Sequence, residues 1–171
     1  SIIYPPYYCT IPALEAINSI YNVIAVVCQP DKVGNRNEVK YCPIKEYALK
    51  NNILVLQPES IKNEYKDIIK LEPDMIVTCA YGQIVPKELL DYPRLGCINV
   101  HASLLPKLRG GAPIHRAIID GYSETGITIM YMDENMDTGD IISKDSTTIL
   151  SSDDLESLHD RLSMMGKKLL L

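Results

Sequence analysis

Residues 98–106 read Ile-Asn-Val-His-Ala-Ser-Leu-Leu-Pro, a short alternating run that ends in a loop. Successive side chains of a strand point to opposite faces, so Ile98 and Val100 are expected to face the core together. Asn99 and His101 are then expected to share the opposite face. Because open α/β sheets bind ligands at the carboxyl ends of their strands, this stretch predicts an α/β fold with a polar site where the strand ends.

Short apolar runs alternate with amphipathic stretches before this strand. We expect strands at residues 2–4, 23–28, 53–56, 75–79 and 97–100. Helices are expected between them, at residues 11–20, 43–51, 59–71 and 86–90. Alternation of this kind predicts an α/β protein with a doubly wound, mostly parallel sheet that carries helices on both faces.

The pattern changes beyond residue 102. Residues 103–111 form a loop rich in proline, glycine and basic residues, and a helix at 112–119 follows. Strands are expected at 125–132 and 140–143, separated by a tight acidic loop at 133–139. A last helix is expected to begin after the capping residues 151–154, with one apolar face made by Leu155, Leu158, Leu162, Met165 and Leu169.

Composition and charge limit the kind of protein. The chain has 171 residues, of which 46% are hydrophobic and 23% charged, which is typical of a single soluble domain with a real core. Its net charge of -5 argues against broad, non-specific nucleic-acid binding, although a local basic patch could still contact RNA. We see no secretory leader and no apolar run long enough to span a membrane, so we expect a cytoplasmic protein.

The five cysteines do not indicate a metal site. They are Cys9, Cys28, Cys42, Cys79 and Cys97, and no two of them form a CxxC pair. A structural zinc site needs clustered ligands, so no metal is expected. Single cysteines in apolar runs are usually small core residues, and the pattern fits a reducing compartment.

The two polar residues of the decisive strand have useful chemistry. Asn99 can donate an N–H to a carbonyl oxygen, and His101 can donate, accept or carry a proton near neutral pH. Together they could stabilise an oxyanion. The structural alternative, a satisfied polar pair that caps the strand end, remains open from these residues alone.

The acidic loop offers a possible partner for the histidine. Asp133, Asn135 and Asp137 fit the first ligand positions of a calcium loop. Thr138 and Lys144 stand where that loop needs glycine and glutamate, which excludes calcium. Two interpretations remain: an acidic turn that closes a hairpin, or a carboxylate that orients a histidine or takes up the proton of an amine.

The combination of these stretches resembles a known superfamily. Asn99-Val100-His101 followed by residues 103–106 is similar to the signature of the folate-dependent formyltransferases, in which an asparagine, a histidine two residues on and a later aspartate form the catalytic set. The resemblance implies that Asn99, His101 and Asp137 are catalytic and that the fold is the Rossmann-like formyltransferase fold.

Further stretches resemble the methionyl-tRNA formyltransferases within that superfamily. These stretches are residues 29–31, 57–58, 80–86, 96–99, 109–114 and 124–130, and the similarity runs from about Ile11 to Gly166. It implies transfer of a formyl group from 10-formyltetrahydrofolate to the α-amino group of initiator methionyl-tRNA, in translation initiation and without a metal. Residues 1–171 would be a single catalytic domain, without the family's small tRNA-binding β-barrel.

The resemblance also implies binding residues. Those for folate are Tyr81, Gly82, Gln83, Ile84, Ser103, Leu104, Leu105, Pro106 and Asp133, and those for tRNA are Lys32, Arg36, Lys40 and Arg109. An ordinary strand-to-helix turn and a solvated polar loop are the alternatives for residues 81–84 and 31–42. The family has a Gly-Thr-Pro turn where this chain has Pro5-Pro6-Tyr7, and proline cannot take a positive φ, so this turn must differ.

Other functions remain possible at this point. The chain could be a formyltransferase of the same superfamily that acts on an amino-sugar nucleotide or on glycinamide ribonucleotide, or a non-catalytic fragment that binds folate or tRNA. A nicotinamide dinucleotide domain ranks last, because no GxGxxG follows the first strand. We expect a monomer.

Overall fold

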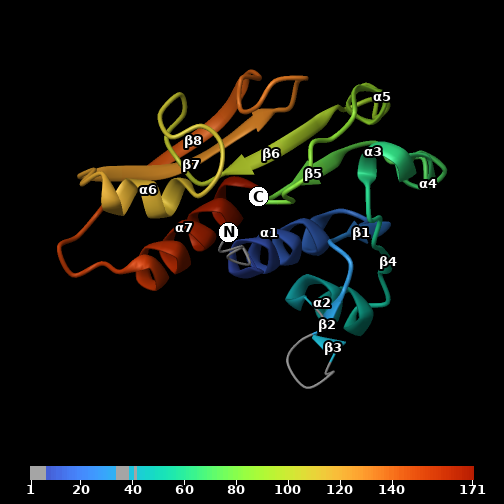
Figure 1. Cartoon of the computed structure of the whole chain (residues 1–171), viewed down its shortest axis with the longest axis horizontal. Coiled ribbons are helices and arrows are strands. Elements are labelled where there is room, and N and C mark those ends of the chain that lie inside the picture. The colour runs from blue at the N-terminus through green and yellow to red at the C-terminus, as the bar shows by residue number, and fades with distance from the viewer. Residues whose placement is uncertain (1–6, 34–38, 41) are drawn as a thin grey trace.

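The computed structural model describes residues 7–33, 39–40 and 42–171 (Figure 1). The strand expected at residues 2–4 and the Pro5-Pro6 turn lie outside them. The first half of the chain alternates helices and short strands. These are α1 (Tyr7–Ile20), β1 (Ala25–Val27), β2 (Lys32–Val33), β3 (Val39–Lys40), α2 (Pro43–Lys50), β4 (Leu54–Leu56), α3 (Ile61–Glu64), α4 (Lys66–Ile69), β5 (Ile76–Thr78) and α5 (Lys87–Leu90).

The second half forms the longer strands. It contains β6 (Cys97–His101), α6 (Pro113–Ile119), β7 (Glu124–Tyr131), β8 (Ile141–Thr148) and α7 (Leu155–Leu169). The largest sheet has the order β5-β6-β7-β8, in which β5 and β6 are parallel and the other neighbours are antiparallel. A parallel pair, β1-β4, and an antiparallel pair, β2-β3, complete the strands of the described residues. The loop between β7 and β8 is too short for a parallel crossover, so this part of the mixed sheet is antiparallel.

Helices cover both faces, as the alternating pattern predicts. On one face of the strands, Val26 of β1 packs against α1 and α2, and Ile98 of β6 packs against α7. The adjacent Val27 and Cys97 pack with side chains of α3, α4 and α5. The α/β class and its helix-covered faces are therefore confirmed. No helix of the described residues is both long and apolar enough to cross a bilayer.

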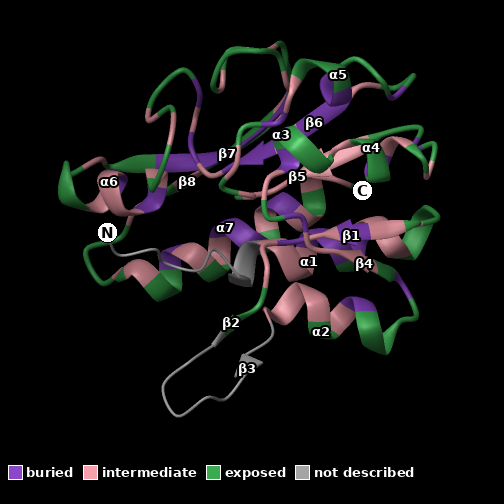
Figure 2. Ribbon diagram, turned by 45° about the vertical axis from the view of Figure 1, so that its right-hand side comes forward, coloured by how far each residue is buried: buried purple, intermediate pink, exposed green. Residues whose placement is uncertain are grey.

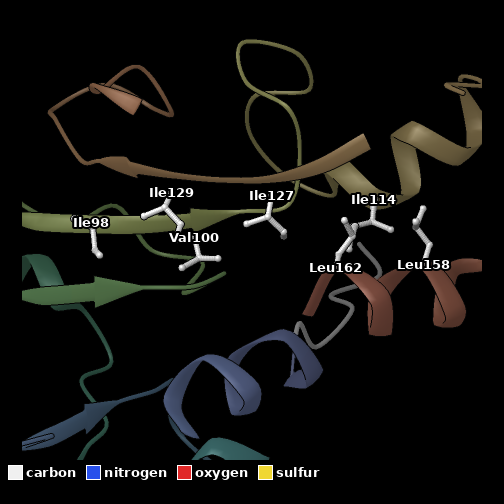
Figure 3. Packing of buried hydrophobic residues seen from close by; sticks show 7 residues of the cluster. All are labelled: Ile98, Val100, Ile114, Ile127, Ile129, Leu158 and Leu162. Carbon is white, nitrogen blue, oxygen red and sulfur yellow. The ribbon is translucent and has the colours of Figure 1, made fainter. Parts of the chain in front are cut away.

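The main apolar cluster joins the sheet to the last helix (Figure 3). Residues of β6, β7, α6 and α7 meet there: Ile98, Val100, Ile127, Ile129, Ile114, Leu158 and Leu162. Leu158 and Leu162 are completely buried, and Leu155, Met165 and Leu169 pack at the edge of the same cluster. The apolar face expected for the last helix is therefore the one that α7 buries, and Figure 2 shows the buried residues concentrated along β6 and β7.

Three parts of the chain differ from the expectations. The segment 31–42, expected as a loop, contains the paired strands β2 and β3. The helix expected at 59–71 is two short helices, α3 and α4, because the backbone bonds restart at Tyr65, whose carbonyl accepts from Ile68 and Ile69. The strand expected at 140–143 continues to Thr148, although its later residues are polar. Among the described strands, β8 pairs with β7 alone, and this backbone pairing holds it in the sheet without an apolar face.

An ion pair at the start of α7 predicts a pH effect. Arg161 donates to both oxygens of Asp153, at 3.0 and 2.6 Å, and Leu150 N–H donates to the same carboxylate. These contacts, Arg161 first, lower the pKa of Asp153 to about 2. The pKa is depressed in the folded state, so the stabilisation is complete above the unfolded value of about 4 and disappears as the pH falls towards 2.

We therefore expect Asp153→Asn to lower stability at neutral pH and to flatten its decline between about pH 4 and 2. The measurement is the urea midpoint of unfolding at a series of pH values. Asp67→Asn is the matched control, because Asp67 and Lys70 form an exposed pair of the kind that contributes little. An equal decline with pH in the parent chain and in Asp153→Asn would contradict the prediction.

Candidate active site

The carboxyl end of β6 brings together three side chains that are distant in the sequence. His101 Nδ1 lies 3.7 Å from Asp137 Oδ2, and Asn99 Nδ2 donates to Asp137 Oδ1 at 3.5 Å. The side chains of His101 and Asp137 are only 8% and 9% exposed. All three residues expected to be catalytic therefore meet in one nearly buried cluster.

Backbone geometry holds the carboxylate in this position. Asp137 has a positive φ of 54°, which turns the loop after β7 back towards β6. Gly110 N–H donates to Asp137 Oδ2 at 2.7 Å. A buried carboxylate needs such donors, because burial without partners is costly. The loop of residues 103–112 therefore supports the aspartate and connects it with the polar end of β6.

His101 is held from both ring nitrogens. Its Nε2 lies 3.0 Å from Leu108 O, and Nδ1 faces Asp137. A carbonyl oxygen can only accept, so Nε2 carries a proton in this arrangement. Leu108 itself has a positive φ of 55°. The ring therefore has a fixed orientation, and Leu108 O occupies the hydrogen-bonding position at Nε2.

Thr78 is a site residue that the sequence analysis missed. It lies opposite Asn99 in the β5–β6 pairing, and its hydroxyl donates to Asn99 Oδ1 at 2.8 Å. The reversed amide would place Oδ1 against the carboxylate of Asp137, which is repulsive. Thr78 and Asp137 together therefore present Asn99 Nδ2 as a donor in the cluster. The signal available in the sequence was a hydroxyl at the end of the neighbouring expected strand.

Residues 103–106 mainly build their own loop. The Ser103 hydroxyl donates to Lys107 O at 2.7 Å, and the Ser103 carbonyl accepts from Thr128 Oγ1 at 2.6 Å. Leu105 N–H donates to the same threonine hydroxyl, and its side chain is buried. Leu104 is half-buried, and Pro106 is exposed. Of the four expected folate contacts here, Ser103 and Leu105 are therefore already occupied within the protein.

The loop at residues 81–84 is clamped by glutamine side chains. Gln29 donates to Tyr81 O at 2.8 Å, and Gln83 Nε2 donates to Gln29 Oε1 at 3.0 Å. Gln83 Oε1 accepts from Ile61 N–H. Gly82 has a positive φ of 83°, and Ile84 is 77% exposed. The loop is therefore fixed by Gln83 and leaves the side chain of Ile84 at the surface.

Tyr81 carries an unpaired polar atom in the same loop. Its hydroxyl is buried and has no hydrogen-bond partner in the described part of the chain. Burial, followed by the charges of Cys28 and Glu64, raises the pKa of Tyr81 to about 12. A buried hydroxyl without a partner is rare in proteins and is compatible with a ligand atom that completes the bond.

Asp133 lies beside a pocket. Its carboxylate accepts from Asn135 N–H and from the Thr138 hydroxyl, both at 2.8 Å, so it organises the acidic loop. The pocket has a volume of about 320 Å³ and is lined by Lys87, Leu90, Asp91, Met132, Asp133, Glu134 and Asn135. The Thr78 hydroxyl, which donates its proton to Asn99 Oδ1, also lies 3.1 Å from Met132 Sδ, so the pocket is close to Asn99.

The expected tRNA residues do not form one cluster in the described residues. Lys32 is exposed in β2, opposite Lys40 of β3, whose side chain is not described. Arg36 lies outside the described residues. Arg109 is exposed at the surface of the 103–112 loop, and its carbonyl accepts from Arg116. Within the described ranges, no group of three or more His, Cys, Asp or Glu side chains is arranged to hold a metal ion.

Curated relatives align with most of this chain. The chain is 53% identical over 165 residues to "Methionyl-tRNA formyltransferase" of Bacillus subtilis (strain 168), an alignment that covers 94% of this chain and 52% of the relative. The protein of the same name from Enterococcus faecalis is 51% identical over 166 residues, with 95% and 53% covered. The chain therefore spans about half the length of the curated relatives it matches.

Solved structures share the fold. Glycinamide ribonucleotide transformylase 1 from Geobacillus kaustophilus superposes with a TM-score of 0.78 at 24% identity, covering 96% of this chain and 89% of that one. A formyltetrahydrofolate deformylase from Pseudomonas syringae gives 0.76 at 20% identity, covering 95% and 56%. These likenesses are evidence of fold alone. The family model described as "Formyl transferase" matches residues 10–171, and the chain belongs to that family.

Proposed function

We propose that this chain transfers a formyl group from 10-formyltetrahydrofolate to the α-amino group of methionyl-tRNA. The observation that carries the proposal is the convergence of Asn99, His101 and Asp137 at the carboxyl end of β6. The identity of 53% to a methionyl-tRNA formyltransferase supports this choice of acceptor over the other acceptors of the superfamily.

The folate supplies the formyl group as a substrate, and the chain's residues would act on the charges that develop. The neutral amine attacks the formyl carbon, and a free α-amino group has a pKa of about 8, so a sizeable fraction is neutral near pH 7–8. Asn99 Nδ2 would donate to the formyl oxygen as it gains negative charge. The Nε2–H of His101 would donate to the same oxygen once Leu108 O moves away from Nε2. Asp137 would orient the imidazole and help to remove the amine proton. Collapse of the tetrahedral intermediate would then break the bond between the formyl carbon and N10 of the folate, and N10 would leave with a proton.

The pocket beside the acidic loop is our proposed place for the folate ring. It adjoins Asn99 through Met132 and Thr78, and Asp133 contributes to its lining. Its volume of about 320 Å³ lies at the lower end of the range for small-molecule sites. The unpaired hydroxyl of Tyr81 supports a role of the 81–84 loop in folate binding. Ser103 and Leu105 would act indirectly, by shaping the 103–112 loop.

The tRNA would meet the surface next to this site. Arg109 is exposed on the loop that donates to Asp137 through Gly110, so a phosphate bound there would lie near the reacting groups. Lys32 of β2, Lys40 of β3 and Arg36, which lies between them in the sequence, would supply further contacts. Phosphate contacts of this kind weaken as salt concentration rises. We also propose that the chain works as a monomer in the cytoplasm.

An acceptor panel tests the proposal. The chain is incubated with 10-formyltetrahydrofolate and, separately, with methionyl-tRNA, an amino-sugar nucleotide or glycinamide ribonucleotide. We expect formylation of methionyl-tRNA. Asp137→Ala, which should be nearly inactive, serves as the negative control. Turnover with only one of the other acceptors would overturn the assignment of the acceptor.

A non-catalytic fragment that binds folate or tRNA is the second candidate, because Leu108 O occupies His101 Nε2 and the Ser103 hydroxyl is already bonded to Lys107 O. A fluorescence titration with the folate and with methionyl-tRNA separates the two functions. Binding of both without turnover on any acceptor would favour the fragment. Turnover, even if weak, would exclude it.

The contact of Thr78 with Asn99 predicts a change in rate. Thr78→Val keeps the shape but removes the hydroxyl that fixes the amide, and a lost hydrogen bond of this kind costs about 1 kcal/mol. We expect kcat to fall about 3- to 10-fold with KM unchanged for both substrates. Thr78→Ser restores the donor and should restore kcat. A serine variant as slow as the valine variant would argue against this role for the hydroxyl.

A further inference from the structure

Two cysteines that the proposed reaction does not use lie in contact. Cys28 follows β1 directly, and Cys42 immediately precedes α2. Their side chains are hydrogen-bonded to each other, and both are free thiols. The segment between them includes Lys32, Arg36 and Lys40. The two sulfur atoms therefore meet where the two ends of the segment with these basic residues come together.

Neighbouring polar contacts hold the two ends of this segment together. Lys45, in the first turn of α2, pairs with Asp31 at 2.5 Å and donates to Gln57 Oε1 at 2.9 Å. Gln57 Nε2 donates to Gln29 O, next to Cys28. Cys28 N–H donates to Leu56 O at 3.0 Å. The contact between the thiols is thus part of a bonded joint between β1, β4 and α2.

The two thiols have unequal environments. Cys28 is only 5% exposed, whereas Cys42 is partly exposed. The hydrogen bond from Cys28 lowers the pKa of Cys42 to about 6, with help from the backbone N–H groups of Lys45 and Ile44 and against burial and the charge of Asp31. The same contact, with burial, raises the pKa of Cys28. Cys42 therefore resembles an attacking thiolate, and Cys28 a shielded thiol behind it.

We propose that Cys28 and Cys42 form a thiol–disulfide exchange site that a small-molecule disulfide, such as oxidised glutathione, converts into an intramolecular disulfide. The proposal is independent of formyl transfer. It rests on the contact between the two thiols, on their unequal exposure and on the joint that holds them.

The exchange proceeds in two balanced steps. The Cys42 thiolate attacks one sulfur of the small disulfide, forms a mixed disulfide and releases one thiolate, which takes up a proton. Cys28 then loses its proton, attacks the Cys42 sulfur and releases the second small thiol. In total, two protein thiols are oxidised and one small disulfide is reduced to two thiols. The S–S bond is about 2.05 Å long, so the sulfur atoms must approach by side-chain rotation from their hydrogen-bonded contact.

Peptide mapping tests the bond directly. The reduced chain, in a Cys9→Ser background, is incubated with oxidised glutathione, alkylated and digested with trypsin. Trypsin cleaves after Lys32 and Lys40, so Cys28 and Cys42 stay together only through a disulfide. Cys9→Ser removes the other cysteine of the peptide that contains Cys28. We expect the linked pair, with a loss of two hydrogen masses from the chain.

Variants separate this site from general thiol oxidation. Cys28→Ala and Cys42→Ser should abolish the linked pair, whereas Cys79→Ser should retain it. Circular dichroism shows whether each variant folds. Two reduced thiols at equilibrium with excess oxidised glutathione would overturn the proposal. A stable mixed disulfide at Cys42 that Cys28 never resolves would also overturn it.

The pH dependence of alkylation is a second, independent measurement. With iodoacetamide, the rate at Cys42 should rise with a midpoint near pH 6. Cys28→Ala removes the donor to the thiolate and should move this midpoint upward, towards the ordinary cysteine value of about 8.5. A Cys42 midpoint near the ordinary value in the parent chain, unchanged by Cys28→Ala, would contradict the attacking role of Cys42.

Discussion

Alanine at Asn99, at His101 or at Asp137 is expected to lower the rate of formyl transfer about 100- to 1,000-fold while the fold survives. The reason is geometric. Asn99 and His101 both contact Asp137, and the two carboxylate oxygens are divided between them. Each variant removes either a donor to the developing negative charge or the group that orients those donors.

The expected pattern of the double variant is equally specific. Because His101 and Asp137 are neighbours in one cluster, their effects should not add. We expect His101→Ala/Asp137→Ala to be about as slow as the slower single variant. The measurements are single-turnover rates with methionyl-tRNA and 10-formyltetrahydrofolate, and a thermal unfolding curve for each variant. Fully additive effects would mean that the two residues act separately.

A control with a different aspartate separates catalysis from charge. Asp120 is exposed at the end of α6, and Asp120→Ala should keep the parental rate. Near-parental activity in all three alanine variants of the cluster would end the proposal that this cluster performs the reaction. Loss of folding in any of them would show instead a structural role for that side chain.

Gly139→Ala should have the largest effect on the fold near the site. A Cβ atom at Gly139 would lie 1.8 Å from Tyr131 O and 2.7 Å from Tyr131 C, which is far inside van der Waals contact. Both atoms belong to the backbone of β7, next to the bond in which Tyr131 N–H donates to Asp140 O. The chain can accommodate alanine only by opening the join between β7 and β8.

The loss of stability should be about 3 kcal/mol or more, at the upper end of the cost of overpacking. The rate of formyl transfer should fall as well, because the loop that carries Asp137 lies within the opened region. Urea unfolding followed by circular dichroism gives the stability. Gly111→Ala is the matched control, since a Cβ there meets no atom within 4 Å and should change stability by less than about 0.5 kcal/mol. Equal stability of the two variants would contradict the argument.

Periodic patterns in the sequence predicted the parts that depend on local geometry. The alternation around Asn99 and His101 indicated the strand and its polar face, because β side chains alternate whatever their neighbours are. The spacing of Leu158 and Leu162 indicated the buried face of α7 for a similar reason. The antiparallel run of β8 was harder to foresee, since its polar residues carry no apolar signal and its partner strand holds it.

Contacts between distant residues could not be predicted in the same way. Thr78 reaches Asn99 only because β5 and β6 pair in one register, and the Ser103 hydroxyl is occupied by Lys107 only in the folded loop. The Cys28–Cys42 contact likewise depends on the joint between β1 and α2. No spacing rule predicts such pairs, because they depend on strand register and on the path of the folded loops rather than on local periodicity.

The sequence by itself determined the α/β class, the strand with its two polar residues and, through resemblance, the choice of Asp137. Only the tertiary structure decided that Asp137 lies against His101, which way the Asn99 amide faces and which loop residues are already occupied. The physical reason is that periodicity and side-chain chemistry are local properties, whereas the register of strands and the return of a loop depend on the packing of the whole chain.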